Sequence, residues 1–160
     1  MEPPQQSYNA PALPVGKSVE NALPEQTTMI PARLARMREL RAFLEGFCAA
    51  SGLSGDTCLR LNLVLEELFT NTVRHGHGGD CDAPVWVSLV RQSGLVRMTY
   101  EDNAPAFNPY ARLPTRSPDT TGEMRKLGGL GVLLTKEMAK SRDYAYLFGR
   151  NRIRLVLAAG

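Results

Sequence analysis

The chain has 160 residues, is 43% hydrophobic and carries a net charge of +3. These values suit one folded domain with a substantial core, and no apolar run reaches the roughly 18 residues that a membrane helix needs. Three cysteines without C-x-x-C spacing argue against a disulfide framework or a four-thiolate zinc site. The first residues lack the apolar core of a signal peptide, so we expect a cytoplasmic protein.

Charge is unevenly distributed along the chain. Residues 111–160 contain ten Lys and Arg against four Asp and Glu, whereas residues 1–110 contain nine against twelve. A basic C-terminal part is suited to contact phosphate, nucleic acid or an acidic partner. Because no tight Lys/Arg cluster occurs, scattered solvated charge is the competing interpretation.

The first half of the chain predicts a tail followed by helices. Residues 1–16 are rich in Pro, Gln and Asn, which indicates a flexible N-terminal tail before a single domain at 17–160. We expect one edge strand at 17–23. Apolar residues at helical spacing predict a first helix that begins at Pro31 and ends at Gly52. A second helix should run from a Ser54 or Asp56 cap to Gly76, with 59–69 buried on nearly all sides.

The pattern then becomes that of β-structure. Residues 84–92 and 95–102 flank a Ser-Gly turn and predict an antiparallel hairpin. Residues 108–129 have no periodicity and many turn residues, which is typical of a functional lid. A third helix at 130–141 should precede a second hairpin formed by 144–149 and 151–159. This order predicts an α+β two-layer sandwich, with helices on one face of a mainly antiparallel sheet.

The second helix carries an unusual polar stripe. Glu67, Asn71 and His75 are spaced four residues apart and so share one helix face. A buried helix does not hold a carboxylate and an amide without compensation. The stripe therefore faces either solvent or a ligand cavity, in which the amide oxygen would suit Mg²⁺ and the glutamate would suit a general base.

Two further segments are chemically suggestive. Asp102 ends a strand before a Pro-rich turn, where it could accept a hydrogen bond from an exocyclic amine or simply initiate the turn. Gly128, Gly129 and Gly131 precede a predicted helix, where backbone N–H groups can approach an anion. The same glycines would also suit a flexible hinge.

The order of these segments resembles a known family. "EELFTNTVRHG", "YEDNAPAFNPY" and "GGLGVLLTKEMAK" together are similar to the Bergerat-fold (GHKL) ATPases, specifically the bacterial anti-sigma-factor serine/threonine kinases, over residues 30–158. The closing "GRNRIRLVL" is similar to that family's last hairpin. The resemblance implies a histidine-kinase-like ATPase fold and an ATP- and Mg²⁺-dependent protein kinase. Its substrate would be an anti-sigma-factor antagonist.

The same resemblance implies partners and their exchange. A sigma factor or other regulator would compete with the unphosphorylated antagonist for the kinase, so that transcription is regulated by partner switching. Members of the family are often homodimers. No direct contact with nucleic acid or membrane is implied.

The resemblance also implies residue roles. Glu67 would be the general base, with Glu66 as the fallback, and Asn71 would bind the Mg²⁺ that bridges the ATP phosphates. Asp102 would accept from the adenine amino group. The 110–128 stretch would be the ATP lid. The other ATP-binding positions implied are Arg74, His75, Ala104, Phe107, Arg125, Lys126, Gly128, Gly129, Leu130, Gly131 and Val132.

Ala104 departs from the family pattern, which often has Asp-x-Gly at this point. Alanine does not readily adopt positive φ, so this position bears on ATP affinity.

Other functions also fit these residues. The chain could be an ATP-sensing binding module without transfer activity, a kinase-like domain that works with a histidine phosphoacceptor, or a basic nucleic-acid-binding domain. The stretch "NTVRHGHGGDCD" at 71–82 could also hold a transition metal. Its three glycines and the lack of a second ligand cluster favour a helix end and an exit loop instead.

Overall fold

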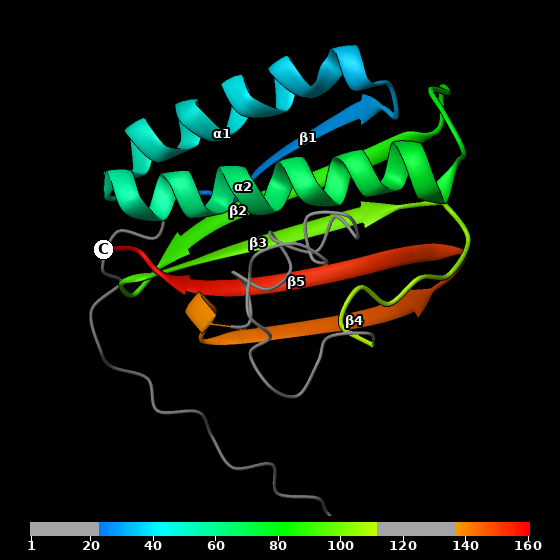
Figure 1. The fold of residues 1–160 in the computed structure, drawn as a ribbon. Helices are drawn as coiled ribbons and strands as arrows, with labels where there is room; N and C mark the ends of the chain where they lie inside the picture. The colour runs from blue at the N-terminus through cyan, green and yellow to red at the C-terminus, as the bar shows by residue number, and fades with distance from the viewer. Residues whose placement is uncertain (1–22, 112–136) are drawn as a thin grey trace, which may run out of the picture.

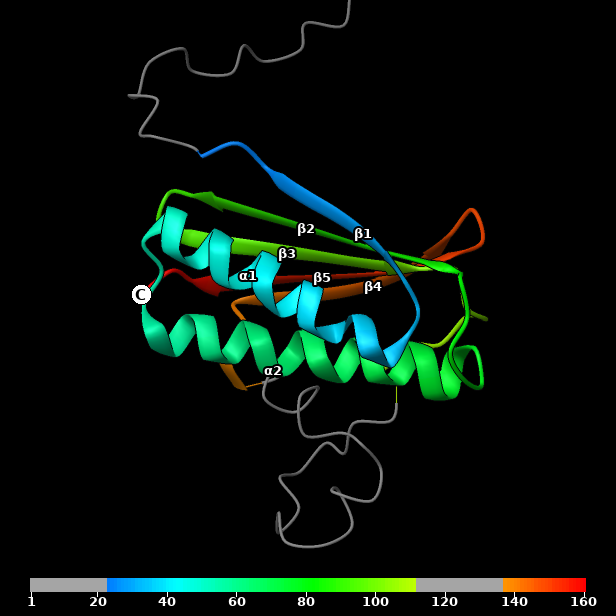
Figure 2. The ribbon, with the colours of Figure 1, turned by 90° about the horizontal axis from the view of Figure 1, so that it is seen from above.

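The computed structural model describes residues 23–111 and 137–160. In these residues five strands form one antiparallel sheet in the order β1-β2-β3-β5-β4, and two α-helices pack on one of its faces (Figures 1 and 2). This arrangement confirms the expected α+β two-layer sandwich. The strands are β1 (Gln26–Pro31), β2 (Pro84–Gln92), β3 (Leu95–Asp102), β4 (Ser141–Leu147) and β5 (Arg150–Ala158), and the α-helices are α1 (Met37–Ser51) and α2 (Gly55–Asn71).

Local sequence signals explain how the helices begin and end. Gly52 ends α1 with a φ of 59°, and the Ser54 side chain caps α2 by accepting from the Thr57 backbone N–H. A short 3₁₀ turn, η1 (Leu34–Arg36), precedes α1. After Asn71 the helix continues as a wider π-helical turn, η2 (Thr72–Gly76), in which the His77 N–H donates to the Thr72 carbonyl at 2.9 Å.

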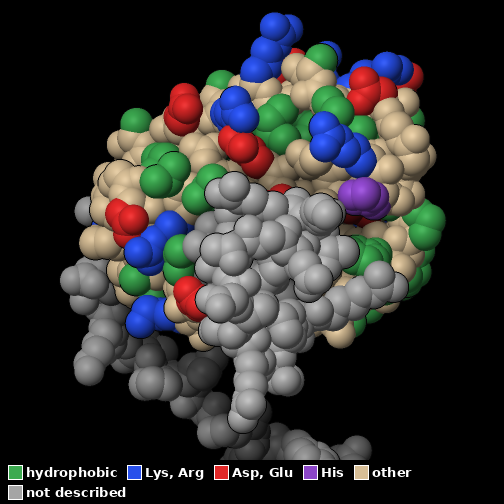
Figure 3. Space-filling view, in the orientation of Figure 1, with side chains coloured by type: hydrophobic (Ala, Val, Ile, Leu, Met, Phe, Trp, Pro, Cys, Tyr) green, Lys and Arg blue, Asp and Glu red, His purple; other side chains and the backbone are tan. Residues whose placement is uncertain are grey.

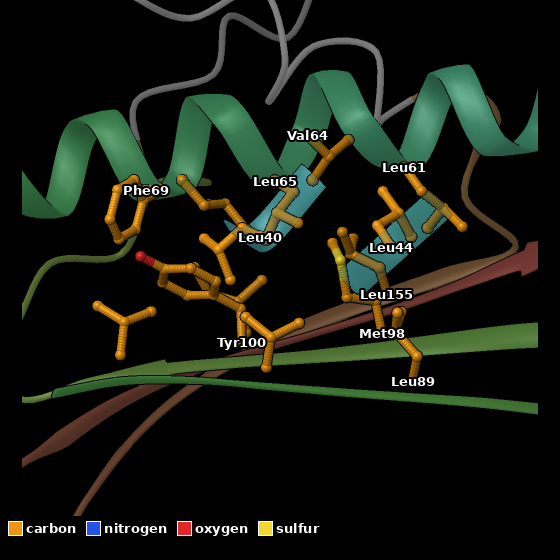
Figure 4. Close-up of a cluster of buried hydrophobic side chains, with 14 of the residues drawn as sticks. Leu40, Leu44, Leu61, Val64, Leu65, Phe69, Leu89, Met98, Tyr100 and Leu155 are labelled. Carbon is orange, nitrogen blue, oxygen red and sulfur yellow. The ribbon is translucent and has the colours of Figure 1, made fainter. Parts of the chain in front are cut away.

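The core lies between the two helices and the sheet. Leu40 and Leu44 of α1 meet Leu65 and Phe69 of α2 over the inward-facing side chains of the central strands (Figure 4). Strand positions alternate between this core and the opposite face, as expected for a sheet covered on one side. The helix α2 and the strand β3, which end near Asp102, therefore pack against the same apolar core.

The second helix is not buried on all sides, contrary to the expectation for 59–69. Leu59 is 58% exposed and Leu63 is 39% exposed. Because α1 and the sheet contact only part of the surface of α2, the remaining apolar positions face away from the core.

The helix that was expected to begin at Pro31 begins later, and a strand precedes it. The expected edge strand at 17–23 lies almost wholly outside the described residues, and its one described residue, Leu23, is not in a strand. The first strand in the described residues is β1, in which Ile30 is buried and β-branched residues precede it. Pro31 ends this strand opposite Pro84 rather than beginning a helix. An edge strand tolerates proline because only one of its sides needs ladder hydrogen bonds.

The second half of the chain matches the expected hairpins. The boundaries 84–92 and 95–102 are those of β2 and β3, joined by Ser93 and Gly94, both with positive φ. β4 and β5 form the second hairpin, although β4 begins already at Ser141, where the third helix was expected to end. Glu137 and Met138 are helical. The tail at 1–16, most of the expected lid and most of the third helix lie outside the described residues.

The helix-bearing surface carries mixed charge. Basic and acidic side chains are interspersed on the described part of this surface (Figure 3). Several of them pair, including Arg36 with Glu39 at 2.7 Å and Arg41 with Glu66 at 2.6 Å. In the described ranges, no helix is long and apolar enough to cross a membrane.

Candidate functional site

A cavity of about 320 Å³ opens where the end of α2 lies beside the end of β3 and the beginning of β5. Its wall combines polar groups with apolar surface, as ligand pockets commonly do. The lining residues in the described part of the chain are Leu68, Asn71, Thr72, His75, Gly76, Tyr100, Asp102, Ala104, Pro105, Phe107, Pro109, Asn151 and Ile153.

One face of the second helix and its π-helical turn forms a large part of this wall. The lining positions 68, 71, 72, 75 and 76 are separated by three and four residues, so they share one face. Asn71 and His75 are therefore brought together as expected. Glu67 is half-buried beside this face but does not line the cavity.

The two neighbouring glutamates have different environments. The Glu66 carboxylate accepts from the Arg41 guanidinium at 2.6 Å and so joins the two helices. From the described residues, Glu67 accepts a single long hydrogen bond, at 3.4 Å, from the Asn71 amide. Burial raises the pKa of the Glu67 carboxyl, while the Asn71 hydrogen bond and nearby His75 oppose this rise.

The Asn71 side chain has an acceptor oxygen that no described residue uses. Its Nδ2 donates to Glu67, and its Oδ1 has no hydrogen-bond partner among residues 23–111 and 137–160. A neutral amide oxygen that lines a cavity fits a Mg²⁺ ion shared with phosphate oxygens.

Asp102 is the buried carboxylate of the site, only 6% exposed. Its Oδ1 accepts from Asn151 Nδ2 at 2.8 Å and from the Ala104 backbone N–H at 3.0 Å. Its Oδ2 accepts from the Thr72 hydroxyl at 2.6 Å. These neutral donors stabilise a buried charge that would otherwise be costly to desolvate.

The buried Tyr100 hydroxyl is a hydrogen-bond partner of the Thr72 hydroxyl. The Thr72 hydroxyl lies 2.7 Å from the Tyr100 hydroxyl and 3.0 Å from the Leu68 carbonyl. Thr72 has one proton, and the short contact with the charged Asp102 oxygen is its best acceptor, so Tyr100 donates to Thr72. Burial, and to a lesser extent Asp102, raises the pKa of Tyr100 well above its ordinary value, which keeps this donor protonated.

Asn151 joins Asp102 to the loop that follows β3. Besides Asp102, its Nδ2 lies 3.1 Å from each of the Ala104 and Pro105 carbonyls. Its Oδ1 accepts from the Phe107 N–H at 2.9 Å and from the Tyr144 hydroxyl at 2.7 Å. Burial raises the pKa of Tyr144, which therefore remains a donor.

Sequence reasoning missed Thr72, Tyr100 and Asn151. A signal for Asn151 was present: it occupies an inward-facing position of β5, where the alternate residues Ile153 and Leu155 are buried. A polar residue at a core position requires a polar partner. That the partner is Asp102, 49 residues earlier, is visible only in the fold.

Ala104 causes no backbone strain. In the described chain, the non-glycine residues with positive φ are Ser93 and Phe148, so Ala104 does not need the conformation that glycine favours. Its methyl group is buried against Gly76, where a Cβ atom would lie only 2.8 Å from the Ala104 Cβ. The space for the Ala104 side chain is thus provided by Gly76.

The expected site residues divide into three groups. Glu67 and the exposed Arg74 do not line the cavity. Arg125, Lys126, Gly128, Gly129, Leu130, Gly131 and Val132 lie outside the described residues. Those that the cavity brings together are Asn71, His75, Asp102, Ala104 and Phe107. The 71–82 stretch does not gather a metal cluster: within 23–111 and 137–160, no three His, Cys, Asp or Glu side chains are grouped to hold an ion.

Comparisons with known proteins agree with this architecture. Residues 30–157 match the family model described as a histidine kinase-like ATPase domain. Relatives named serine-protein kinase RsbW, from Listeria monocytogenes and Listeria innocua, are 26% identical over 115 residues, which cover 70% of this chain and 73% of the relative.

A solved structure shares the fold. The RsbU and RsbW domains of Rv1364c from Mycobacterium tuberculosis match with a TM-score of 0.57 and 16% identity over 85% of this chain. The match spans about a third, 32%, of that longer chain. The expected resemblance to GHKL anti-sigma-factor kinases is thereby confirmed, and the chain belongs to the histidine kinase-like ATPase domain family.

Proposed function

We propose that this protein is an ATP- and Mg²⁺-dependent serine/threonine kinase of the anti-sigma-factor type. The observation that carries the proposal is that Asp102 and Asn71 line one cavity, each with an acceptor position that no residue among 23–111 and 137–160 fills. The carboxylate suits the amino group of adenine, and the amide oxygen suits a Mg²⁺ ion shared with phosphates. The RsbW relatives support the kinase assignment at the level of the family.

In this proposal the described residues orient ATP. Asp102 accepts from the adenine amino group, and Ala104 and Phe107 pack beside the nucleotide. Asn71 would hold Mg²⁺, which supplies charge neutralisation when bound, and His75 and Arg74 would lie near the phosphates. The family resemblance extends the phosphate contacts to Arg125, Lys126 and the 128–132 segment.

Glu67 is proposed as the general base. The acceptor hydroxyl oxygen bonds to the γ-phosphorus as the bond from that phosphorus to the β–γ bridging oxygen breaks, and ADP leaves. Glu67 takes the hydroxyl proton. Its raised pKa favours this role, since a base works best when its pKa approaches the working pH. Glu66 suits the role less well because Arg41 already binds it.

The partners follow from the same family. The phosphoacceptor is proposed to be an anti-sigma-factor antagonist, and a sigma factor or other regulator is proposed to compete for the kinase. A homodimer is proposed as the functional unit. The second candidate function is a non-catalytic ATP-sensing module, favoured by the position of Glu67 beside the cavity rather than in its wall.

Nucleotide binding tests the first part of the proposal. Calorimetry should show ATP binding that strengthens with Mg²⁺. Asn71→Ala should abolish most of this Mg²⁺ effect and weaken Mg-ATP binding about tenfold or more, since it removes the proposed metal contact. A folded wild-type protein that binds neither ATP nor ADP would contradict the proposal.

A labelling experiment separates the two candidate functions. The protein is incubated with radiolabelled ATP and an extract of its native cells, and then recovered with its partners. The kinase proposal predicts a co-recovered protein labelled on serine or threonine. ATP binding without any labelled protein would favour the sensing module.

A further inference from the structure

We propose that Asn151 is a positioning residue that sets the nucleobase preference of the site through Asp102. This inference rests on the proposed ATP-binding function. Asn151 is 4% exposed on β5, and it lies among the residues that surround the cavity.

Asn151 has no polar capacity left for a ligand. Its two amide protons face three acceptors, on Asp102, Ala104 and Pro105, and its oxygen receives two donors. A side-chain amide has two N–H donors and two acceptor lone pairs, so all of its hydrogen-bonding positions are used within the protein. The neighbours also determine which way the amide is oriented, because a carboxylate requires N–H and the Phe107 N–H requires an oxygen. Asn151 therefore acts on a ligand through Asp102.

The consequence for Asp102 is an asymmetric carboxylate. Oδ1 accepts two hydrogen bonds, from Asn151 and the Ala104 N–H, and is saturated. Within the described part of the chain, Oδ2 accepts one hydrogen bond, from Thr72, and keeps one acceptor position. A base that presents an amino group can donate to this position. A base that presents a carbonyl there would place two acceptors against each other, so the site should select adenine over guanine or hypoxanthine.

The same amide also holds the wall of the cavity. Asn151 links the end of β3, the 104–107 loop and β4, so that Asp102 and Phe107 are oriented by one side chain. Buried polar networks of this kind are strong when fully satisfied and costly when one donor is lost.

The test exchanges the Asn151 donor for an acceptor of the same shape. Asn151→Asp keeps an oxygen for Phe107 and Tyr144 but places a second carboxylate beside Asp102. Above neutral pH the variant should bind ATP about tenfold or more weaker than wild type, and its preference for ATP over GTP should fall. As pH is lowered toward 5, the ratio of variant to wild-type Kd should decrease, because one shared proton restores a donor to Asp102.

Tyr144→Phe is the matched control. It removes a hydroxyl from the other side of Asn151 and leaves the contact with Asp102, so the ATP/GTP preference should stay within about threefold of wild type. If Asn151→Asp does not fold, as judged by circular dichroism, Asn151→Ser replaces it. The serine side chain is too short to replace the amide at Asp102, so the preference should again fall.

The possible outcomes distinguish failure of the Asn151 positioning role from failure of the proposed nucleotide binding. A wild type that binds ATP, together with folded Asn151 variants that keep its ATP/GTP ratio and pH dependence, would overturn the positioning role alone. A folded wild type that binds no nucleotide would overturn both proposals.

Discussion

Glu66 and Glu67 show how one step along a helix changes the chemistry of a side chain. The Glu66 carboxylate pairs with the Arg41 guanidinium, whereas Glu67 is half-buried and accepts a hydrogen bond from Asn71. Partial desolvation disfavours the charged form of Glu67 and raises the pKa of its carboxyl group. A carboxyl group with a raised pKa is a better proton acceptor near neutral pH than one at the ordinary glutamate value.

The pH dependence of phosphate transfer tests this difference. Transfer should rise with pH through an ionisation above the ordinary glutamate value of 4.5, since Glu67 must lose its proton first. Glu67→Gln should lower the rate by roughly 10²–10⁴-fold and remove this step while ATP binding persists. Glu66→Gln is the control and should keep the step. A wild-type pH profile in Glu67→Gln would contradict the base assignment.

The same shift has a consequence for stability. A raised pKa means that Glu67 favours the folded state fully below its unfolded pKa, and that this contribution is lost as pH rises through its folded value. At neutral pH, thermal melting should therefore find Glu67→Gln no less stable than wild type.

At the scale of elements, the site depends on how closely the end of the second helix approaches the loop after β3. The π-helical turn brings Gly76 against Ala104, and an added Cβ on Gly76 would lie 2.8 Å from the Ala104 Cβ. Only one member of this pair can carry a methyl group, so the two residues are coupled.

This coupling predicts a compensating pair. Gly76→Ala should destabilise the fold by about 1–3 kcal/mol, because the clash forces the turn and the loop apart. Adding Ala104→Gly should restore much of the loss, as denaturant unfolding of the single and double variants would measure. Gly46→Ala on α1 is the control: nothing lies within 4 Å of its Cβ position, so it should gain about 0.5–1 kcal/mol. Strict additivity of the two site substitutions would contradict the contact.

At the scale of the whole molecule, the cavity joins segments that are distant in the sequence. Asp102 and Asn151 are 49 residues apart, and Thr72 reaches Asp102 across 30 residues. A ligand bound among α2, β3 and β5 would therefore stabilise the packing of the helical layer on the sheet. Binding to the folded state alone shifts the unfolding equilibrium by mass action.

Thermal unfolding should report this linkage. Mg-ATP at 100 times its Kd should stabilise the fold by about 2.7 kcal/mol, which raises Tm by roughly 5–10 °C for a domain of this size. Asn71→Ala should need a higher Mg-ATP concentration for the same rise. A Tm of the wild type that does not change with Mg-ATP concentration would contradict specific binding to the native state.

The sequence by itself determined the features that depend on neighbouring residues. Period-two patterns and the Ser-Gly turn predicted the β2–β3 hairpin with its observed ends, and Ser54 was a recognisable helix cap. Spacing of four placed Asn71 and His75 on one face. The order of motifs indicated the family, because each motif combines local geometry with a chemical type.

The tertiary structure decided what depends on contacts between distant segments. It placed Glu67 at the side of the cavity, paired Glu66 with Arg41 and matched Gly76 to Ala104. It also assigned the hydrogen bonds of Asp102, most importantly the one from Asn151. Local patterns record propensity and periodicity, whereas the satisfaction of a buried polar group depends on which segments the hydrophobic core brings together.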